Sequence, residues 1–355
     1  MKLFALGPVA MYPRTLEVAA QQILYFRTPE FSEIMLDSER LLKKHLSAED
    51  NAKTVFLTAS GTAAMEATIM NCFTETDKLL IIDGGIFGHR FVEICDIHGI
   101  PYDALMLAFG EKLTEKQLQQ YEGKKYTALV VNIHETSTGQ LYDVNMLAAF
   151  CRRNGLYFIV DAISSFMADE YNMVEYGIDA TILSSQKGLA IAPGMAVVVL
   201  SDRLYKEKVM NNHPKTLYFN FVDHIDNLKR GQTPFTPAVG TALQLNDMLH
   251  SIEEEGLENR LAYLRFMVSD FRRRLSETEL YLPSYPISYA ASPLLFPREN
   301  ASIVYEILKN EYDIVLTPCG GDLKNKVLRV AHIGNHTIEE NAPLIGKLQE
   351  VLHRV

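Results

Sequence analysis

The feature that most constrains the fold is a repeated order of segments: a short apolar run, a turn of small or polar residues, then a helical stretch. Thr54–Thr58, for example, leads through Ser60-Gly61-Thr62 into a helical pattern from Ala63 to Phe73. The apolar runs show no polar alternation, which is typical of strands covered by helices on both faces of their sheet. Strands that alternate with helices predict an α/β fold with a mostly parallel sheet. The other strands predicted in this way are Leu79–Ile82, Ala128–Ile133, Tyr157–Val160, Thr181–Leu183 and Met195–Leu200.

The pattern changes after about residue 238, where two long helical stretches, 238–255 and 257–275, follow each other. Shorter strands and helices come after them. We therefore expect a smaller C-terminal α/β domain beside a large domain. The expected division is an N-terminal segment near the cleft, a large cofactor-binding domain and a small C-terminal domain, at residues 1–15, 16–249 and 250–355.

Composition excludes several classes of protein. Hydrophobic residues make up 48% of the 355 residues and charged residues 22%, as in globular proteins. The net charge of −10 argues against a nucleic-acid binder, whose affinity comes from excess Lys and Arg. No apolar run approaches the roughly 18–20 residues of a membrane helix, and the first eight residues do not resemble a signal peptide. The four cysteines form no C-x-x-C pair, so we expect no metal site, reduced thiols and a cytoplasmic location.

Two residues at predicted strand ends suggest covalent cofactor chemistry. Lys187 follows a buried strand, where desolvation lowers the pKa of an amine and makes it nucleophilic toward aldehydes. Asp161 ends another strand, where a carboxylate needs a partner. A surface lysine and a helix-capping aspartate are the ordinary alternatives. Together the two residues match a pyridoxal 5′-phosphate (PLP) site, which needs a Schiff-base lysine and an acid beside the pyridine nitrogen.

Three further features are compatible with such a site. Ser60-Gly61-Thr62 lies between a strand and a helix, where backbone N–H groups can bind a phosphate or the serine can simply cap the helix. Phe87 follows a strand end and could stack on a ring or belong to the core, and the chain has no Trp. Arg329 lies in an apolar strand and requires an anion, either a structural carboxylate or the carboxylate of a substrate.

The order of these motifs resembles the fold type I, PLP-dependent class V aminotransferases. The resemblance is to the branch containing alanine–glyoxylate, serine–pyruvate and 2-aminoethylphosphonate–pyruvate aminotransferases. It covers essentially the whole chain, and the spacing from Asp161 to Lys187 of 187 − 161 = 26 residues also agrees. The matching segments are Gly7-Pro8, Arg27–Phe31, Ser60-Gly61-Thr62, His134–Gly139, Asp161–Ser165, Ser184–Lys187 and Leu328–Gly334.

The resemblance implies a role for each matching residue. Lys187 would hold the internal aldimine and move a proton between Cα and C4′, and Asp161 would keep the ring nitrogen protonated. Arg329 would bind the α-carboxylate of the substrate. The phosphate-binding site would be completed by a threonine of a partner subunit, which implies a homodimer with shared active sites. The remaining implied contacts are Phe87 and Ile163 on the two ring faces, Thr136 at the ring hydroxyl, Ser60, Gly61, Thr62 and Gln186 at the phosphate, and Thr236, rather than Thr233, from the partner.

The predicted activity is transfer of an amino group from a small amino acid to pyruvate or glyoxylate. A 2-aminoethylphosphonate donor is the alternative, since Arg27, Arg90 and the Tyr12-Pro13-Arg14 segment offer cations for a phosphonate. Phe26 precedes Arg27 where many family members have His, so this segment leaves the substrate open.

Three other functions are less consistent with the sequence. Cysteine desulfurases carry a Cys loop near the position of Cys319, but they have His at the positions of Phe87 and Gln186. A non-catalytic PLP-fold binding protein would not need Lys187, Asp161 and Arg329 together. A nicotinamide-dependent dehydrogenase would carry G-x-G-x-x-G after its first strand, and none is present.

Overall fold

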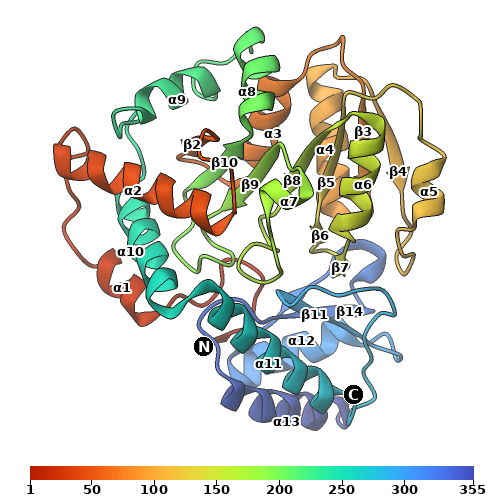
Figure 1. Cartoon of the computed structure of the whole chain (residues 1–355). Helices are drawn as coiled ribbons and strands as arrows, with labels where there is room; N and C mark the ends of the chain where they lie inside the picture. Colours follow the sequence, from red (N-terminus) through yellow and green to blue (C-terminus); the bar gives the residue numbers. More distant parts are fainter.

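A seven-stranded sheet in the order β2-β10-β9-β8-β5-β3-β4 organises the larger part of the chain in the computed structural model, which describes residues 1–355 (Figure 1). Only β10 runs antiparallel to its neighbours, β2 and β9. The strands are β2 (Lys53–Leu57), β3 (Leu79–Asp83), β4 (Tyr102–Met106), β5 (Ala128–Asn132), β8 (Tyr157–Asp161), β9 (Ala180–Ser184) and β10 (Ala196–Leu200). The predicted α/β fold with a mostly parallel sheet is confirmed.

Successive residues of each strand belong to two different hydrophobic clusters, one on each face of the sheet. In β5, Leu129 and Val131 pack into one cluster and Ala128 and Val130 into the other. Both faces are therefore dry, which explains the continuous apolar runs. One face is covered by α3 (Gly61–Cys72), α4 (Ile86–His98), α8 (Asp202–Glu207) and α9 (Phe221–Leu228), and the other by α2 (Pro29–His45), α6 (Val144–Asn154), α7 (Met173–Tyr176) and α10 (Val239–Glu255).

Strand β4 is absent from the sequence prediction. It is one of the two edge strands of the sheet, and its side chains are mostly half-buried or exposed, including Asp103. The other edge strand, β2, is buried in all but its first residue, whereas β4 buries only Leu105 and so lacks the apolar pattern that identifies the others. Shorter elements complete this part of the chain: α1 (Pro13–Ala19), α5 (Glu115–Gln119), η1 (Val209–Asn211) and the hairpin strands β6 (His134–Glu135) and β7 (Gln140–Leu141).

The C-terminal part has its own sheet and its own hydrophobic cluster. Strand β14 (Val327–Ala331) pairs antiparallel with β11 (Ala291–Leu295) and β13 (Thr317–Pro318). Its cluster includes Phe271, Leu328 and Leu348. The helices are α11 (Leu257–Leu275), α12 (Ala301–Tyr312), η2 (Gly321–Leu323), η3 (Ile338–Glu340) and α13 (Asn341–Leu352). None of the helices of the protein combines the length and the hydropathy needed to cross a lipid bilayer.

The N-terminus joins this C-terminal part, as Figure 1 shows. Strand β1 (Lys2–Leu3) pairs parallel with β12 (Ile314–Val315). The predicted domain boundary at residue 250 lies inside α10, which continues to Glu255, and the chain bends at Gly256 with φ of 83°. The division into domains stays a prediction.

Candidate active site

The predicted site residues gather where the carboxyl ends of β5, β8 and β9 face the C-terminal part. This edge is where parallel sheets present their functional groups, because side chains of the connecting turns converge there. The hairpin of β6 and β7 closes it on one side, and Leu141 donates its backbone N–H to Pro286 O at 2.8 Å.

Lys187 is partly buried and touches the N-terminal segment. Its Nζ donates a hydrogen bond to the carbonyl of Leu6. Gly7 has φ of +127°, a conformation that favours glycine, and a Cβ atom there would lie 2.8 Å from Lys187 Cε, so a side chain at this position would displace the lysine. Burial and the positive charge of Arg329 lower the pKa of Lys187 to about 8. A substantial fraction of the amine is therefore unprotonated near neutral pH, the form that attacks an aldehyde.

Asp161 is a buried acid without a cationic partner. It ends β8 with 6% of its surface exposed and accepts a hydrogen bond from Ile163 N at 2.8 Å. Burial raises its pKa to about 7, and the nearby charge of Glu135 acts in the same direction. Lys187 opposes this shift without forming an ion pair with it. An acid in such surroundings gains from a cationic neighbour, which a protonated ring nitrogen can provide.

The start of α3 is open to an anion. Ser60 is the N-cap residue, yet its hydroxyl makes no capping hydrogen bond, so this group and the first backbone N–H groups remain available. A Cβ atom at Gly61 would lie 2.5 Å from Ile163 Cδ1, which shows how closely these two segments approach. Thr62 Oγ1 accepts from Arg90 at 3.2 Å, and Gln186 Oε1 accepts from Ser184 Oγ at 2.5 Å.

Three more predicted residues lie on neighbouring segments. Phe87, in the first turn of α4, is partly buried, and the Arg90 guanidinium lies 4.9 Å from its ring centroid. Thr136 is buried in the turn after β6, with Oγ1 at 2.8 Å from Ser164 Oγ. Ile163 lies between Asp161 and Ser164 and is partly buried. Thr136 also connects this edge to Arg329 through its carbonyl oxygen.

Arg329 carries a buried charge that no acidic side chain neutralises. Only 8% of its surface is exposed. Its Nη1 donates to Thr136 O and its Nη2 to Pro318 O, both at 2.8 Å, while Nε has no partner. The structural salt bridge, which was the alternative for this residue, is not formed. A guanidinium held in place by two carbonyls with no counter-charge can receive a carboxylate.

Thr236 stands apart from this group within a single chain. It is exposed, and its hydroxyl makes no hydrogen bond. Thr233 is buried, and its hydroxyl donates to Phe235 O at 2.7 Å. Of the two threonines, only Thr236 therefore has a hydroxyl available for a ligand.

Three of the cations considered for a phosphonate have other partners. Arg14 pairs with Asp247 and Glu254, both at 2.8 Å. Arg27 donates to Gln232 Oε1 at 3.0 Å and to Thr233 O at 2.9 Å. Arg90 donates to Thr62 Oγ1, so all three arginines have side-chain partners, whereas Arg329 bonds only to backbone carbonyls.

Sequence reasoning missed the individual roles of three residues in this group. Leu6 acts through its backbone carbonyl, which leaves no signal in a sequence. His134 and Glu135 belong to a motif that the sequence identifies, but their burial was not foreseen. Burial, together with the charges of Lys187 and Arg329, lowers the pKa of His134 to about 3, so its imidazole is neutral.

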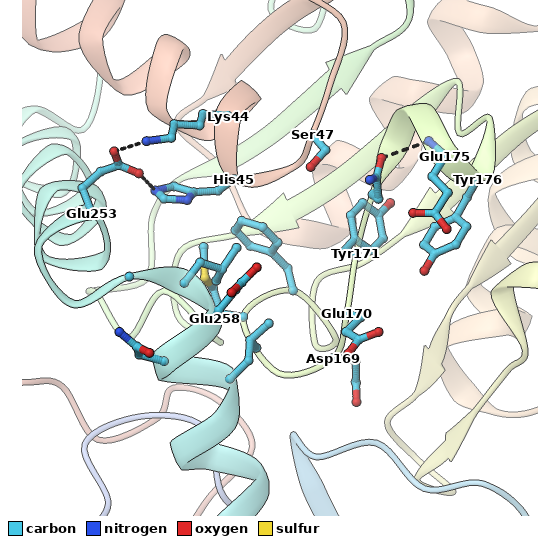
Figure 2. A pocket seen from close by; sticks show the side chains of 17 residues that line it. Lys44, His45, Ser47, Asp169, Glu170, Tyr171, Glu175, Tyr176, Glu253 and Glu258 are labelled. Carbon is cyan, nitrogen blue, oxygen red and sulfur yellow. Dashed lines mark hydrogen bonds and ion pairs between the residues drawn. The ribbon is translucent and has the colours of Figure 1, made fainter.

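A pocket of about 590 Å³ lies outside this group and has a different chemistry (Figure 2). Glu253 interacts there with Lys44 and with His45, the latter at 3.3 Å. The other carboxylates of its lining are Asp169, Glu170, Glu175 and Glu258. This acidic lining disfavours anionic ligands, and none of the predicted site residues belongs to it.

Comparison with known proteins agrees with this arrangement. The sequence model of a family described as "Aminotransferase class-V" matches residues 12–289. The chain is 26% identical to an L-aspartate–glyoxylate aminotransferase of Paracoccus denitrificans, over 94% of this chain and 87% of that protein. It is 28% identical to a soluble hydrogenase 42 kDa subunit of Anabaena cylindrica, over 98% of this chain and 91% of that protein.

The fold comparison points to the same group. An alanine–glyoxylate aminotransferase from Nostoc sp. superposes with a TM-score of 0.93 at 26% identity, covering 99% of this chain and 94% of that one. The family depends on PLP. With the family model matching more than half of the sequence and the site residues gathered at one edge of the sheet, the chain belongs to the class V aminotransferases.

Proposed function

We propose that this aminotransferase uses PLP to move an amino group from a small amino acid to glyoxylate or pyruvate. The observation that carries the proposal is the set of three charged groups at one edge of the sheet. Lys187, Asp161 and Arg329 are all buried or partly buried, and none of them forms an ion pair. Their chemistry matches an aldehyde, a protonated ring nitrogen and a carboxylate.

The residues around Lys187 fit the cofactor. The hydroxyl and backbone N–H groups at Ser60, Gly61 and Thr62, with Gln186, would hold the phosphate. Phe87 and Ile163 would flank the ring, Thr136 would reach its hydroxyl, and Asp161 its nitrogen. When bound, PLP supplies an aldehyde carbon for the lysine amine and a ring that accepts the electron pair released at the substrate α-carbon.

The side chains of the protein have separate tasks in the reaction. Nζ of Lys187, with its pKa lowered to about 8, takes and returns the proton that the α-carbon loses. The Leu6 carbonyl orients this amine when it is free. Arg329 binds and orients the substrate carboxylate, which fixes the bond to be broken relative to the lysine. Ionised Asp161 keeps a proton on the ring nitrogen.

The charge balance supports a substrate with one carboxylate. Arg329 is a buried arginine without a counter-charge, while Arg14 and Arg27 are engaged elsewhere. A phosphonate would need a second cationic partner, and only Arg90 remains nearby. Two relatives named above are glyoxylate aminotransferases with different donors, aspartate and alanine, so glyoxylate is the acceptor we favour. 2-Aminoethylphosphonate with pyruvate stays the alternative.

We further propose a homodimer in which Thr236 of the partner subunit completes the phosphate site. The free hydroxyl of Thr236 supports this choice over Thr233. Large apolar side chains are exposed in and just after α1, among them Leu16 at 49%, Ile23 at 52% and Tyr25 at 67%, and a second copy would cover them. A monomer in sedimentation equilibrium would contradict this assembly, and Thr236→Ala should weaken PLP binding.

A cysteine desulfurase is less consistent with the surroundings of Cys319. Burial raises the pKa of this thiol, and its Sγ lies 3.6 Å from Ser137 O. A nucleophilic cysteine requires the thiolate, which these surroundings disfavour.

A spectral titration tests the proposal. The protein with PLP would be mixed separately with alanine, serine, aspartate, glutamate, 2-aminoethylphosphonate and cysteine, and conversion of PLP to pyridoxamine phosphate followed. Conversion by one small amino acid, reversed by glyoxylate, is expected. Lys187→Ala is the control and should not convert. A protein that takes up no PLP would refute the proposal, and conversion by 2-aminoethylphosphonate alone would establish the alternative.

A further inference from the structure

The turn that follows β6 contains a buried carboxylate with an unusual set of partners. Glu135 has no exposed surface and forms no ion pair. Five hydrogen bonds from neutral donors satisfy it instead. Oε1 accepts from Ser137 N at 3.0 Å, Ser137 Oγ at 2.5 Å and Phe87 N at 3.4 Å, and Oε2 accepts from Gly88 N at 2.9 Å and Asn132 Nδ2 at 2.8 Å.

Two of these donors are backbone groups in the first turn of α4. The N-cap residue of this helix is Gly85, which has no side chain to cap it. Glu135 and Ser137 provide the cap from a distant segment, since Ile86 N also donates to Ser137 Oγ at 3.1 Å. A negative charge at the N-terminus of a 13-residue helix is favourable because of the helix dipole.

The two segments approach so closely that side chains are excluded between them. A Cβ atom at Gly85 would lie 2.7 Å from Glu135 Cδ. One at Gly88 would lie 2.6 Å from Ile82 O. The start of α4 therefore cannot shift toward the strands, and the carboxylate prevents it from moving away.

We propose that Glu135 is a positioning residue that fixes the first turn of α4 and with it the ring of Phe87 beside the cofactor. The inference rests on the proposed function, in which Phe87 flanks the PLP ring. The same turn holds Arg329, because Thr136 O is one of its two acceptors. The short segment that contains Glu135 therefore holds both Phe87, the proposed ring-stacking residue, and Arg329, the proposed substrate-binding residue.

A carboxylate suits this place better than an amide of the same shape. Both oxygens of Glu135 accept hydrogen bonds from N–H or O–H groups, and no neighbouring group accepts a hydrogen bond from its side chain. In Glu135→Gln one oxygen becomes an NH₂ group, which must face at least one of these donors. The variant removes the anchor with almost no change in volume, so effects of core packing are kept small.

The experiment compares E135Q with E93Q, an exposed charge change on the same helix. In the cofactor-free proteins, hydrogen exchange of the 84–92 peptide should be about tenfold faster in E135Q and unchanged in E93Q. PLP affinity should fall about tenfold in E135Q, with altered circular dichroism of the bound cofactor, because a stacked ring is misplaced. Ser137→Ala, which removes one acceptor of the same turn, should shift all three readouts in the same direction by less.

The outcomes separate the two proposals. Wild-type exchange, PLP affinity and dichroism in both E135Q and Ser137→Ala would overturn the role of Glu135 and leave the proposed function intact. A wild-type protein that binds no PLP would overturn the proposed function and this inference together.

Discussion

Replacing Arg329 by alanine tests the proposed substrate site most directly. The guanidinium is 8% exposed, is held by two carbonyl oxygens at 2.8 Å and has one N–H without a partner. No carboxylate of the protein neutralises it, so in the proposed complex its counter-charge is the α-carboxylate of the substrate. Arg329→Ala would leave that carboxylate in a buried place without a cation.

The expected loss is large and falls mainly on substrate binding. Truncating one partner of a buried, hydrogen-bonded charge pair costs about 2–5 kcal/mol. This corresponds to a fall in kcat/KM of about 30-fold to several thousandfold. The carboxylate is bound before and during the reaction, so KM should rise more than kcat falls. PLP affinity should change little, since Arg329 is not among the residues proposed to hold the cofactor.

The assay must separate this effect from a loss of stability. Arg329→Ala also removes the donors from the carbonyls of Thr136 and Pro318. Thr136 is buried, so its unsatisfied carbonyl costs about 1–3 kcal/mol, whereas Pro318 is exposed and its carbonyl can bond to water. Urea unfolding should therefore accompany initial rates with alanine and glyoxylate. Arg298→Ala, which breaks an exposed pair with Glu279, is the matched control. A folded Arg329→Ala protein whose KM stays within about twofold of wild type would refute the assignment.

Three other changes test neighbouring parts of the site. In Gly7→Ala the new Cβ would lie 2.8 Å from Lys187 Cε, and kcat should fall about 100-fold. Gly110→Ala is the control, because φ is also positive there, at +90°, but no atom lies near the new Cβ. Equal rates in the two variants would contradict the contact. In the folded, cofactor-free protein Asp161 has a pKa of about 7, whereas in the unfolded chain its pKa is about 4. The stability that this group contributes is therefore fully present below about pH 4 and is lost as the pH rises from about 4 to about 7. Asp161→Asn should remove this dependence and be more stable than wild type at pH 8 by up to about 4 kcal/mol in urea unfolding, and parallel pH curves would disprove the shift. Cys319→Ser should transaminate at the wild-type rate, and loss of activity would instead give the thiol a role.

The sequence identifies strands according to how completely they are buried. The residues of β5 face two dry clusters alternately, so every position is apolar and the strand is recognisable without its neighbours. Strand β4 buries only one of its five residues and carries Asp103, so its sequence resembles that of a loop. Its place in the sheet follows from pairing with β3, which a sequence does not display.

Site residues are predictable when their own chemistry carries the signal. Lys187 and Asp161 were predicted because charged side chains follow or end buried apolar strands there and because their spacing fits a known family, and their roles stay predictions. The engagement of Arg14 and Arg27 was not foreseen, since their partners lie more than 200 positions away in the chain. The same holds for Leu6, whose contribution is a backbone carbonyl brought to Lys187 by the pairing of β1 with β12.

The charge distribution of the site is costly for the protein alone. Burial raises the pKa of Asp161 and lowers that of Lys187, which means that folding disfavours both charged forms, and the Arg329 charge has no counter-ion. Buried charges without partners destabilise a fold by several kcal/mol, so a structure that keeps three of them needs a compensating interaction. PLP would supply a cationic ring nitrogen for Asp161 and a carbonyl carbon for the Lys187 amine, and the substrate would supply a carboxylate for Arg329. Binding energy that offsets such a cost appears as ligand-dependent stability, and we therefore expect PLP to raise the unfolding temperature of wild type more than that of Asp161→Asn.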